Sequence, residues 1–230
     1  MTEPSVTSSQ MDWIKNLPLQ FLTPDEISLI EKSSVRLNFK KGETIIKQGG
    51  QPTHVAYLEK GIVKFNFENE SNRNLILAIV SSPKIIGGVN LFYQSNNLFS
   101  IVAVEVCEVI LIEASVILQL LKHNAELSFT LLQVTSEMFK KTIVNFVSLA
   151  SKHKEGRIAD IIIHLAENVY YINCFQLSLT RKELAEFASC SPENIIMTLS
   201  RWQKENIIHC SGKGLEILDV EKLKMISKKG

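Results

Sequence analysis

The sequence predicts an α+β protein with an N-terminal antiparallel β-roll or jelly roll, a long helix, and a C-terminal winged helix-turn-helix. Three features predict this order. Between residues 35 and 113, short runs rich in Ile, Val, Phe and Tyr alternate with turn residues at nearly even spacing, a pattern typical of antiparallel rolls and barrels. From 125 to 150, apolar residues recur at helical spacing. Two short capped helices and a hairpin then follow between residues 180 and 218.

The predicted roll is preceded by a short helix that starts at Thr23-Pro24. Within the roll, Ile62–Phe67 shows the alternation of apolar and polar residues expected for a half-buried strand. The other predicted strands are short β-branched or aromatic runs: Thr44–Ile46, His54–Leu58, Leu75–Val80, Ile101–Val104 and Val109–Ile112.

The long predicted helix is apolar on two sides, so it must be buried twice, for example by its own roll and by a second chain. We therefore expect a homodimer whose seam runs along this helix. A single long core helix in a monomer is the alternative. One apolar stripe contains Leu131, Val134, Met138 and Leu149, and the other contains Leu132, Phe139, Ile143 and Phe146.

A polar segment with a glycine, Ser151–Gly156, predicts a hinge after the long helix. An amphipathic helix over Arg157–Asn168 and a strand over Phe175–Leu179 follow it. The predicted domains are therefore a roll at 1–124, a dimerisation helix at 125–150 and a winged helix at 151–230.

Two helix starts lie close together in the C-terminal part. Thr180 and Glu183 have the spacing of a capping box, and Ser191 followed by Pro192 is a second start signal. An ordinary pair of core helices is the alternative to a helix-turn-helix here. The apolar faces of the two helices are predicted to contain Leu184, Ala185, Phe187 and Ala188, and then Ile195, Ile196, Leu199 and Trp202.

The segment after Trp202 predicts a β-hairpin, Ile207–Cys210 and Leu215–Leu218, and a last helix over Val220–Ser227 that is capped by Asp219. A helix-turn-helix followed by such a hairpin is a winged helix. The hairpin therefore favours the DNA-binding motif over the pair of core helices.

Composition and charge exclude several classes of protein. The chain has 230 residues and a formal net charge of +1, so bulk charge does not indicate nucleic acid binding. The four cysteines are scattered without metal-site spacing, which predicts reduced, mostly buried thiols. No secretory signal and no apolar stretch of membrane-spanning length is present. We expect a soluble, cytoplasmic protein without a membrane partner or a metal site.

Four segments occur in a characteristic order: Gly42–Gly49 (GETIIKQG) with Tyr57 and Gly61, Ile85–Phe92 (IIGGVNLF), Glu155–Ala159 (EGRIA) and Leu179–Ala185 (LTRKELA). Together with the predicted architecture, they resemble the Crp/Fnr family of transcription regulators over nearly the whole chain. The resemblance implies a cyclic-nucleotide-binding-like roll, paired long helices, and recognition helices that read a palindromic operator on double-stranded DNA. It also implies contact with RNA polymerase.

The effector site departs from the pattern of the cyclic-nucleotide-binding members, in which a Gly-Glu pair holds the ribose and an Arg-Ser pair holds the phosphate. Gly87 is kept, but Gly88 stands at the glutamate position, and Leu98 and Phe99 stand at the Arg-Ser positions. A phosphate facing Leu and Phe would lack a compensating guanidinium. We therefore do not expect cyclic AMP to bind.

Iron cofactors are not expected either. The iron–sulfur members have cysteines before the roll, whereas the first cysteine here is Cys107. Haem needs an axial ligand, and His54, the only histidine between residues 1 and 122, is expected at a strand end. An apolar pocket under the long helix remains, which either holds an uncharged effector of unknown identity or is filled by its own side chains. Its candidate residues are Gly87, Gly88, Val89, Asn90, Leu91, Leu98 and Phe99.

The recognition helix also departs from the family pattern, in which a Glu and, four residues later, an Arg read base edges. Glu193 could accept from cytosine N4, but Met197 stands at the arginine position. Asn194 could read adenine or only support the helix cap. Pro192 stands where some members have another arginine. We therefore expect less guanine readout, and more reliance on thymine methyl groups and DNA shape.

Basic and capping residues of the winged helix are placed to flank a DNA groove. Each could be a solvated surface group, but as a set on one winged helix they favour DNA contact. The predicted DNA-binding residues are Thr180, Arg181, Lys182, Ser191, Pro192, Glu193, Asn194, Met197, Arg201 and Lys213.

The leading hypothesis is a homodimeric transcription regulator of Crp/Fnr type that is not an enzyme. The second is a small-molecule-binding regulatory module whose winged helix mediates protein contacts. A cupin-like enzyme ranks last, because a metal site in the roll would need clustered histidines and carboxylates and His54 stands alone there.

Overall fold

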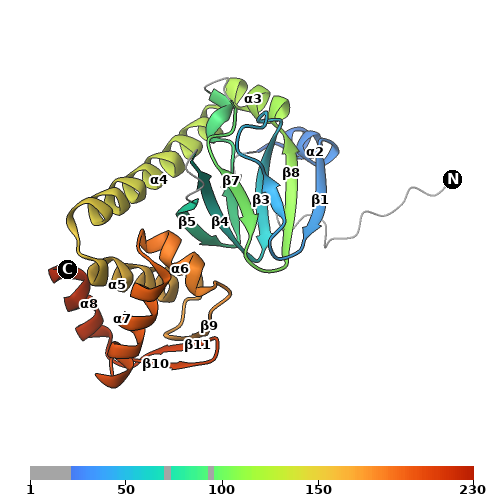
Figure 1. Ribbon diagram of the computed structural model, residues 1–230. Coiled ribbons are helices and arrows are strands. Elements are labelled where there is room, and N and C mark those ends of the chain that lie inside the picture. The colour runs from blue at the N-terminus through green and yellow to red at the C-terminus, as the bar shows by residue number, and fades with distance from the viewer. Residues whose placement is uncertain (1–21, 70–73, 93–95) are drawn as a thin grey trace.

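The computed structural model describes residues 22–69, 74–92 and 96–230. A β-roll lies at one end, a long helix runs from it, and a smaller, mainly helical domain returns beneath the roll (Figure 1). This is the predicted α+β architecture, in the predicted order.

The described part of the roll contains the strands β1 (Ser34–Phe39), β2 (Thr44–Ile46), β3 (His54–Lys60), β4 (Ile62–Glu68), β5 (Asn74–Ser81), β6 (Lys84–Ile86), β7 (Ser100–Ala103) and β8 (Cys107–Glu113). They form two four-stranded antiparallel sheets with the orders β1-β8-β3-β6 and β2-β7-β4-β5. The sequence analysis does not predict β1 or β6.

The core of the roll lies between its two sheets. Strand β4 shows the predicted alternation, since Val63 and Phe65 point into this core while the Lys64 side chain points away from it. The prediction that it is half-buried is wrong, because Ile62 and Asn66 are also buried. Cys107 belongs to this core, and burial raises the pKa of its thiol. His54 begins β3, at a strand end as predicted.

Two helices, α2 (Pro24–Lys32) and α3 (Ala114–His123), cover the sheet that contains β1, β8 and β3. Thr23 and Glu26 form a capping box at the start of α2. Asn124 then caps the long helix by accepting a hydrogen bond from the Leu127 amide at 3.0 Å. Its side-chain amide also donates to Glu26 at 3.2 Å, so α2 and the start of α4 meet here.

The long helix α4 (Ala125–Ser151) has the predicted position and length. The next helix, α5 (Lys154–His164), starts three residues later. The predicted hinge over Ser151–Gly156 is therefore wrong in extent, because only Lys152 and His153 lie outside the two helices. The segment is polar because side chains at these helix ends, such as Ser151, Lys152 and Glu155, form hydrogen bonds or ion pairs.

The C-terminal domain is a winged helix. After α5, the chain makes one wide turn at Leu165–Val169, and the sheet contains β9 (Cys174–Gln176), β10 (Ile208–Ser211) and β11 (Gly214–Ile217) in the order β10-β11-β9. The helices are α6 (Arg181–Ala188), α7 (Pro192–Lys204) and α8 (Val220–Lys229). Strand β9 ends earlier than the predicted Phe175–Leu179, and the Leu177 amide instead donates to the Lys213 carbonyl at 2.9 Å.

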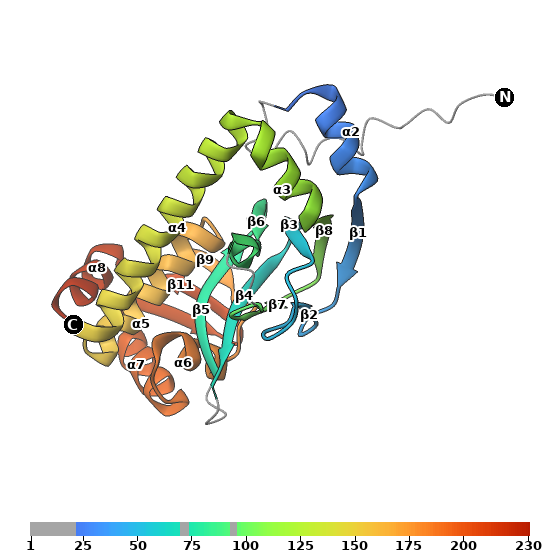
Figure 2. The ribbon, with the colours of Figure 1, turned by 90° about the horizontal axis from the view of Figure 1, so that it is seen from above.

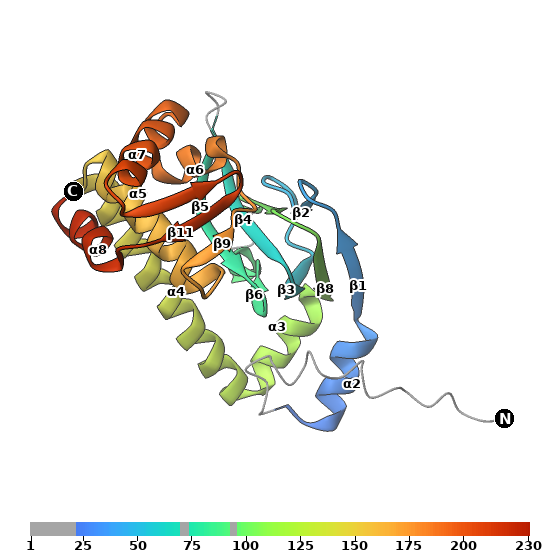
Figure 3. The same cartoon turned by 90° about the horizontal axis from the view of Figure 1, so that it is seen from below.

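The winged helix is docked on the edge strand β5 of the roll, with α6 beside that strand (Figures 2 and 3). One apolar cluster extends from the core of the winged helix across the interface. The side chains that the roll contributes to this cluster are Ile62, Ile76, Ile79 and Val104.

Candidate nucleic-acid interface

The first helix of the motif begins with the predicted capping box. The Thr180 hydroxyl accepts from the Glu183 amide at 3.2 Å, and the Glu183 carboxylate accepts from the Thr180 amide at 2.7 Å. These bonds satisfy amides that have no partner within the helix. The start of α6 is thereby fixed, and with it the positions of Arg181 and Lys182.

The turn between α6 and α7 is tight. Ser189 has a left-handed backbone with φ of 48°, and the Cys190 amide donates back to the Ala185 carbonyl at 3.0 Å. The Ser191 hydroxyl caps α7, whose first residue is Pro192. The second start signal is therefore used as predicted, and the two helices form a helix-turn-helix.

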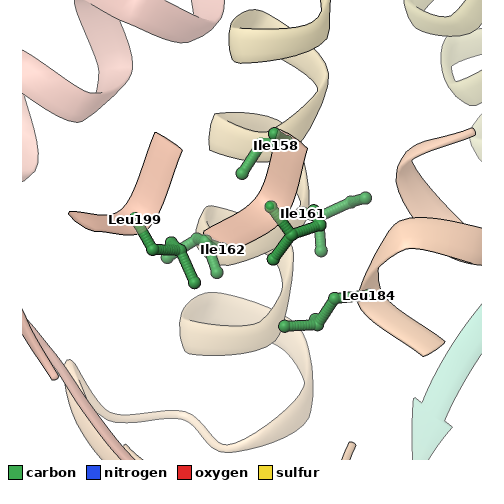
Figure 4. Close-up of a pocket in the computed structure, with 6 residues that line it drawn as sticks. Ile158, Ile161, Ile162, Leu184 and Leu199 are labelled. Carbon is green, nitrogen blue, oxygen red and sulfur yellow. The ribbon is translucent and has the colours of Figure 1, made fainter. Parts of the chain in front are cut away.

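Helix α7 has one buried and one exposed face. Ile195, Leu199 and Trp202 are nearly fully buried. In Figure 4, Leu199 lies opposite Ile161 and Ile162 of α5, with Leu184 of α6 beside them. The space enclosed by these side chains is too small for a water molecule, so this is a packed core that holds the exposed face of α7 in place.

The exposed face of α7 contains Glu193, Ile196 and Met197, and Met197 is 70% exposed. The prediction that Ile196 belongs to the buried face is wrong, because neighbouring helical residues point about 100° apart and Ile195 takes the inward position. Ile196 is 53% exposed. A hydrogen bond from Ser191 lowers the pKa of Glu193 and keeps it an anionic acceptor.

Asn194 takes part in the helix cap. Its side-chain amide donates to the Ser191 hydroxyl at 3.0 Å, and its backbone amide lies 3.4 Å from the same oxygen. This geometry corresponds to the capping alternative left open by the sequence, and it leaves the outward face to Glu193, Ile196 and Met197.

The predicted basic residues differ in their surroundings. Lys182 is 76% exposed in its side chain and lies 3.9 Å from Glu186. Lys213 is exposed in the turn between β10 and β11. Arg181 donates a hydrogen bond to the Cys210 thiol, whose pKa is nevertheless raised, chiefly by burial.

Arg201, near the end of α7, is engaged by two carboxylates. It forms an ion pair with Glu155 at the start of α5, and its Nε lies 3.8 Å from Glu205. The hydrogen bond from Arg201 to Glu155 raises the arginine pKa further. A phosphate would compete with these carboxylates, so Arg201 is less available for DNA than Lys182 or Lys213.

An ion pair joins the helix-turn-helix to the roll. Lys64 of β4 donates to Glu183 of α6 at 2.8 Å, and both side chains are only 15% exposed. Burial alone would raise the pKa of Glu183, but hydrogen bonds from Lys64 and Thr180 outweigh it and the pKa is lowered. Sequence reasoning missed this pair, because nothing in either segment indicates that the two come together.

A second group of bonds anchors the segment that leads into α6. The Lys41 ammonium donates to the Ser178 carbonyl at 2.5 Å, and the Ser178 hydroxyl donates to Glu105 at 2.9 Å. His164 of α5 lies 3.0 Å from the Ile79 carbonyl on the edge strand. The roll therefore holds the helix-turn-helix through α6, through the segment that leads into α6, and through α5.

The described side chains among the predicted effector-pocket residues lie in different surroundings. Leu98 is 59% exposed, whereas the Phe99 ring packs edge-on against Phe65 in the core of the roll, with 5.2 Å between ring centres. Leu91 belongs to a separate small cluster with Val55. The side chains of Val89 and Asn90 lie outside the described part of the chain.

The Gly87-Gly88 pair has a backbone that side chains rarely adopt. The φ angles are 81° and 79°. A Cβ on Gly87 would also lie 2.6 Å from the Ile46 side chain. These positions therefore require glycine, and a glutamate at Gly88 would be strained.

The two stripes of α4 differ in burial. Leu131, Val134 and Leu149 of the first stripe are half-buried, while Met138 is 40% exposed. The second stripe is open to solvent. Its exposed fractions are 61% for Leu132, 66% for Phe139, 45% for Ile143 and 66% for Phe146.

Other kinds of site find no support among the described residues. No group of three or more His, Cys, Asp or Glu side chains is placed to hold a metal ion in that part of the chain. None of the described helices is long and apolar enough to cross a membrane.

Comparison with known proteins gives two matches to family models. Residues 36–124 match the cyclic nucleotide-binding domain, and residues 156–226 match the Crp-like helix-turn-helix domain. The cAMP-activated global transcriptional regulator CRP of Haemophilus influenzae is 25% identical over 178 residues, which cover 76% of this chain and 80% of the relative.

Solved structures show the same fold. FixK2 from Bradyrhizobium japonicum superposes with a TM-score of 0.78 at 15% identity, covering 84% of this chain and 96% of that one. A crp/fnr-family regulator from Eubacterium rectale gives a TM-score of 0.75 at 16% identity, covering 90% and 95%. With both domains matched in the same order, the chain belongs to the Crp/Fnr family of transcription regulators.

Proposed function

We propose that this protein binds a palindromic DNA operator as a homodimer, with α7 of each subunit in the major groove. The observation that carries this proposal is the division of α7 into a buried face and an exposed one. The buried face is anchored by Ile195, Leu199 and Trp202, while Glu193, Ile196 and Met197 on the other face are exposed to solvent. Helix-turn-helix proteins use such an outward face to contact base edges.

The chemistry of this face predicts how DNA is read. Glu193 accepts a hydrogen bond from cytosine N4, while Ile196 and Met197 contact thymine methyl groups. Lys182, Arg181 and Lys213 neutralise phosphates on either side of the groove. Because no arginine lies on this face among its central residues, guanine is read less than in relatives that have the Glu-Arg pair.

The exposed stripe of α4 is the proposed dimer seam. Large apolar side chains in a row along an isolated helix are unusual on a monomer. A second copy of α4 would bury them, and burying a phenylalanine side chain contributes about 1.5–3 kcal/mol. A dimer also explains how one chain with one recognition helix can read two half-sites.

The roll is proposed to work without cyclic AMP. Phe99 occupies the position that would hold the phosphate-binding serine, and its ring is committed to the core against Phe65. The roll then either senses a different, uncharged effector or acts without one. Cyclic AMP should leave the melting temperature of the protein unchanged, because a ligand shifts stability only if it binds the folded state.

The regulator itself would act in the cytoplasm and contact RNA polymerase.

The direct test is fluorescence anisotropy with a labelled duplex from the region upstream of the protein's own coding sequence. We expect a complex that survives an excess of unrelated duplex, with affinity that falls linearly on a log–log plot against salt concentration. The absence of any sequence-selective complex, in this duplex and in DNA selected from a random library, would contradict the proposal.

The variants Arg181→Gln and Lys213→Gln distinguish DNA binding from the alternative, a module whose winged helix contacts proteins. If these side chains contact phosphates, each variant should lose affinity for all sequences alike, and the salt slope should fall by about one. Glu167→Gln removes an exposed charge that pairs with Lys224 away from α7, and it should change neither quantity. Full DNA affinity in both test variants would favour the alternative.

A further inference from the structure

A carboxylate of α5, near its joint with α4, binds side chains from α4, from α8 and from the joint itself. Asp160 of α5 accepts from the Ser148 hydroxyl of α4 at 2.5 Å and from the Ser227 hydroxyl of α8 at 2.5 Å. The Lys152 ammonium, in the joint itself, donates to both carboxylate oxygens at 2.8 Å. A carboxylate offers about four acceptor sites, and these bonds use all of them.

These contacts are stronger than those of an ordinary surface ion pair. The side chains of Lys152 and Asp160 are only 24% and 27% exposed, so solvent screens the attraction between their charges only in part. Hydrogen bonds between two charged groups, such as Lys152 and Asp160, are shorter and stronger than those between neutral groups. Lys152 also lies 3.4 Å from the Ser227 hydroxyl, which closes the network.

Arg157 of α5 adds further hydrogen bonds at the same joint. Its guanidinium donates to the Leu149 carbonyl in the last turn of α4 and to the Ser189 carbonyl in the turn between α6 and α7, each at 3.2 Å. The end of α4 is therefore tied directly to the helix-turn-helix. A joint of two residues with these ties has little freedom to change the angle between α4 and α5.

Helix α8 brings Ser227 to the joint. It packs along α5, with Leu223 fully buried and Ile226 against the core of the winged helix. The approach needs a glycine on α5, because a Cβ on Gly156 would meet Gly230 at 2.8 Å. The last helix thus reaches back to the end of α4, although 75 residues separate Ser227 from Lys152.

We propose that Asp160 is a positioning residue that locks the angle between α4 and the winged helix, and thereby fixes the half-site spacing that the dimer accepts. This inference rests on the proposed function, because α4 sets the position of the second subunit only if the chain dimerises through it. The recognition helix itself is not touched by Asp160, so base preference and spacing preference become separable properties.

The test compares Asp160→Asn, Ser227→Ala and a control, Glu167→Gln. Asparagine has nearly the same shape as aspartate but turns an amide toward the Lys152 ammonium. Ser227→Ala removes one bond of the network and leaves the ion pair. Glu167 pairs with Lys224 of α8 at 3.3 Å, away from α4, so its variant controls for the loss of a carboxylate that contacts α8.

The first measurement is selection of bound duplexes from a random library. We expect the wild type and Glu167→Gln to enrich palindromes of one spacing. Asp160→Asn should enrich the same half-site sequence over several spacings, and Ser227→Ala should lie between. A single spacing for Asp160→Asn, identical to that of the wild type, would overturn the proposal, since a residue that only stabilises the fold would lower all affinities alike.

The second measurement needs no DNA. Hydrogen exchange should become at least about tenfold faster in Asp160→Asn for the Lys152 amide, which donates to Ser148, and the Arg157 amide, which donates to His153. The control should exchange as the wild type does. Unchanged exchange in Asp160→Asn would show that Asp160 does not lock the joint between α4 and α5. If the wild type enriches no DNA, the proposed function fails and the spacing role with it, while exchange still decides whether Asp160 closes the joint.

Discussion

His164 lies at the boundary between the winged helix and the roll. Its Nε2 is 3.0 Å from the Ile79 carbonyl, and its ring meets Phe187 edge-on. Burial lowers its pKa below the ordinary value, against the raising effect of the Ile79 carbonyl. The nearby charges, Lys141 of α4 and Lys84 of β6, also oppose protonation.

This pKa makes the stability of the folded chain depend on pH. The unfolded chain takes up a proton at His164 near the ordinary value of about 6.5, before the folded chain does. The free energy of unfolding contributed by neutral His164 is therefore fully present above that pH and is lost as the pH falls below it. In urea titrations at pH 7.5 and 5.5, His164→Gln should lose less stability on acidification than the wild type.

The control for this experiment is His209→Gln, at an exposed position on β10. It should show the same loss on acidification as the wild type. An equal pH dependence in His164→Gln and the wild type would show that His164 does not titrate at the interface as described.

Met197 decides the base preference of the recognition helix, if α7 enters the groove as proposed. Met197→Arg would place a guanidinium where guanine O6 and N7 can bind it, a contact that discriminates by about 1–3 kcal/mol. Duplexes selected by this variant should gain a guanine at one position per half-site. Met225→Arg adds the same group on α8, at a residue 51% exposed, and should leave the selected sequence unchanged.

The result that would count against this role of Met197 is an identical selected sequence for Met197→Arg and the wild type. In that case the exposed face of α7 would not be the surface that contacts bases.

At the scale of elements, helix α4 carries the proposed assembly. Phe139→Asp would place a charge in the middle of the exposed stripe, and burying it against a second copy would be strongly unfavourable. Sedimentation should show the wild type as a dimer and this variant as a monomer at the same micromolar concentration, with unchanged helix content. Lys141→Asp lies two residues further along, off the stripe, and should remain dimeric.

A dimeric Phe139→Asp would show that the dimer contact lies elsewhere. A monomeric wild type would show that there is no such contact, and the exposed apolar stripe of α4 would then have no explanation.

Periodicity and capping signals predict the individual elements well. The strands β2 to β5, the length of α4, and both helix starts of the helix-turn-helix follow from local sequence, because each depends on residues close together in the chain. The face of Ile196 was mispredicted where two isoleucines stand side by side, since hydrophobicity alone does not say which of two neighbours is buried.

Long-range contacts could not be predicted in this way. The Lys64–Glu183 pair joins residues 119 positions apart, and each side chain alone is typical of a solvated surface. The joint at Lys152–His153 is polar for a similar reason. Ser148 donates to Asp160, and Asp160 in turn accepts from Ser227 of α8. A polar pattern typical of a flexible linker therefore occurs here in a joint that hydrogen bonds hold in place. Of the candidate pocket residues, Phe99 turns inward and Leu98 outward, a difference that hydrophobicity alone does not predict.

At the scale of the whole molecule, the roll, the long helix and the winged helix form one connected body. The winged helix is held at β5 by an apolar cluster and the Lys64–Glu183 pair, and at the end of α4 by the Asp160 network. A change in the roll or in the pairing of α4 would therefore be transmitted to α7 as a change in its position. This arrangement suits a regulator that presents two recognition helices at a fixed separation.

Native mass spectrometry of the protein mixed with a selected palindromic duplex tests this account most directly. We expect one dominant complex that contains two chains and one duplex, and at the same concentrations far less complex with a duplex that keeps only one half-site, because a dimer can then engage only one recognition helix. A complex of one chain with the full palindrome, or equal amounts of complex with both duplexes, would contradict the proposed dimeric recognition.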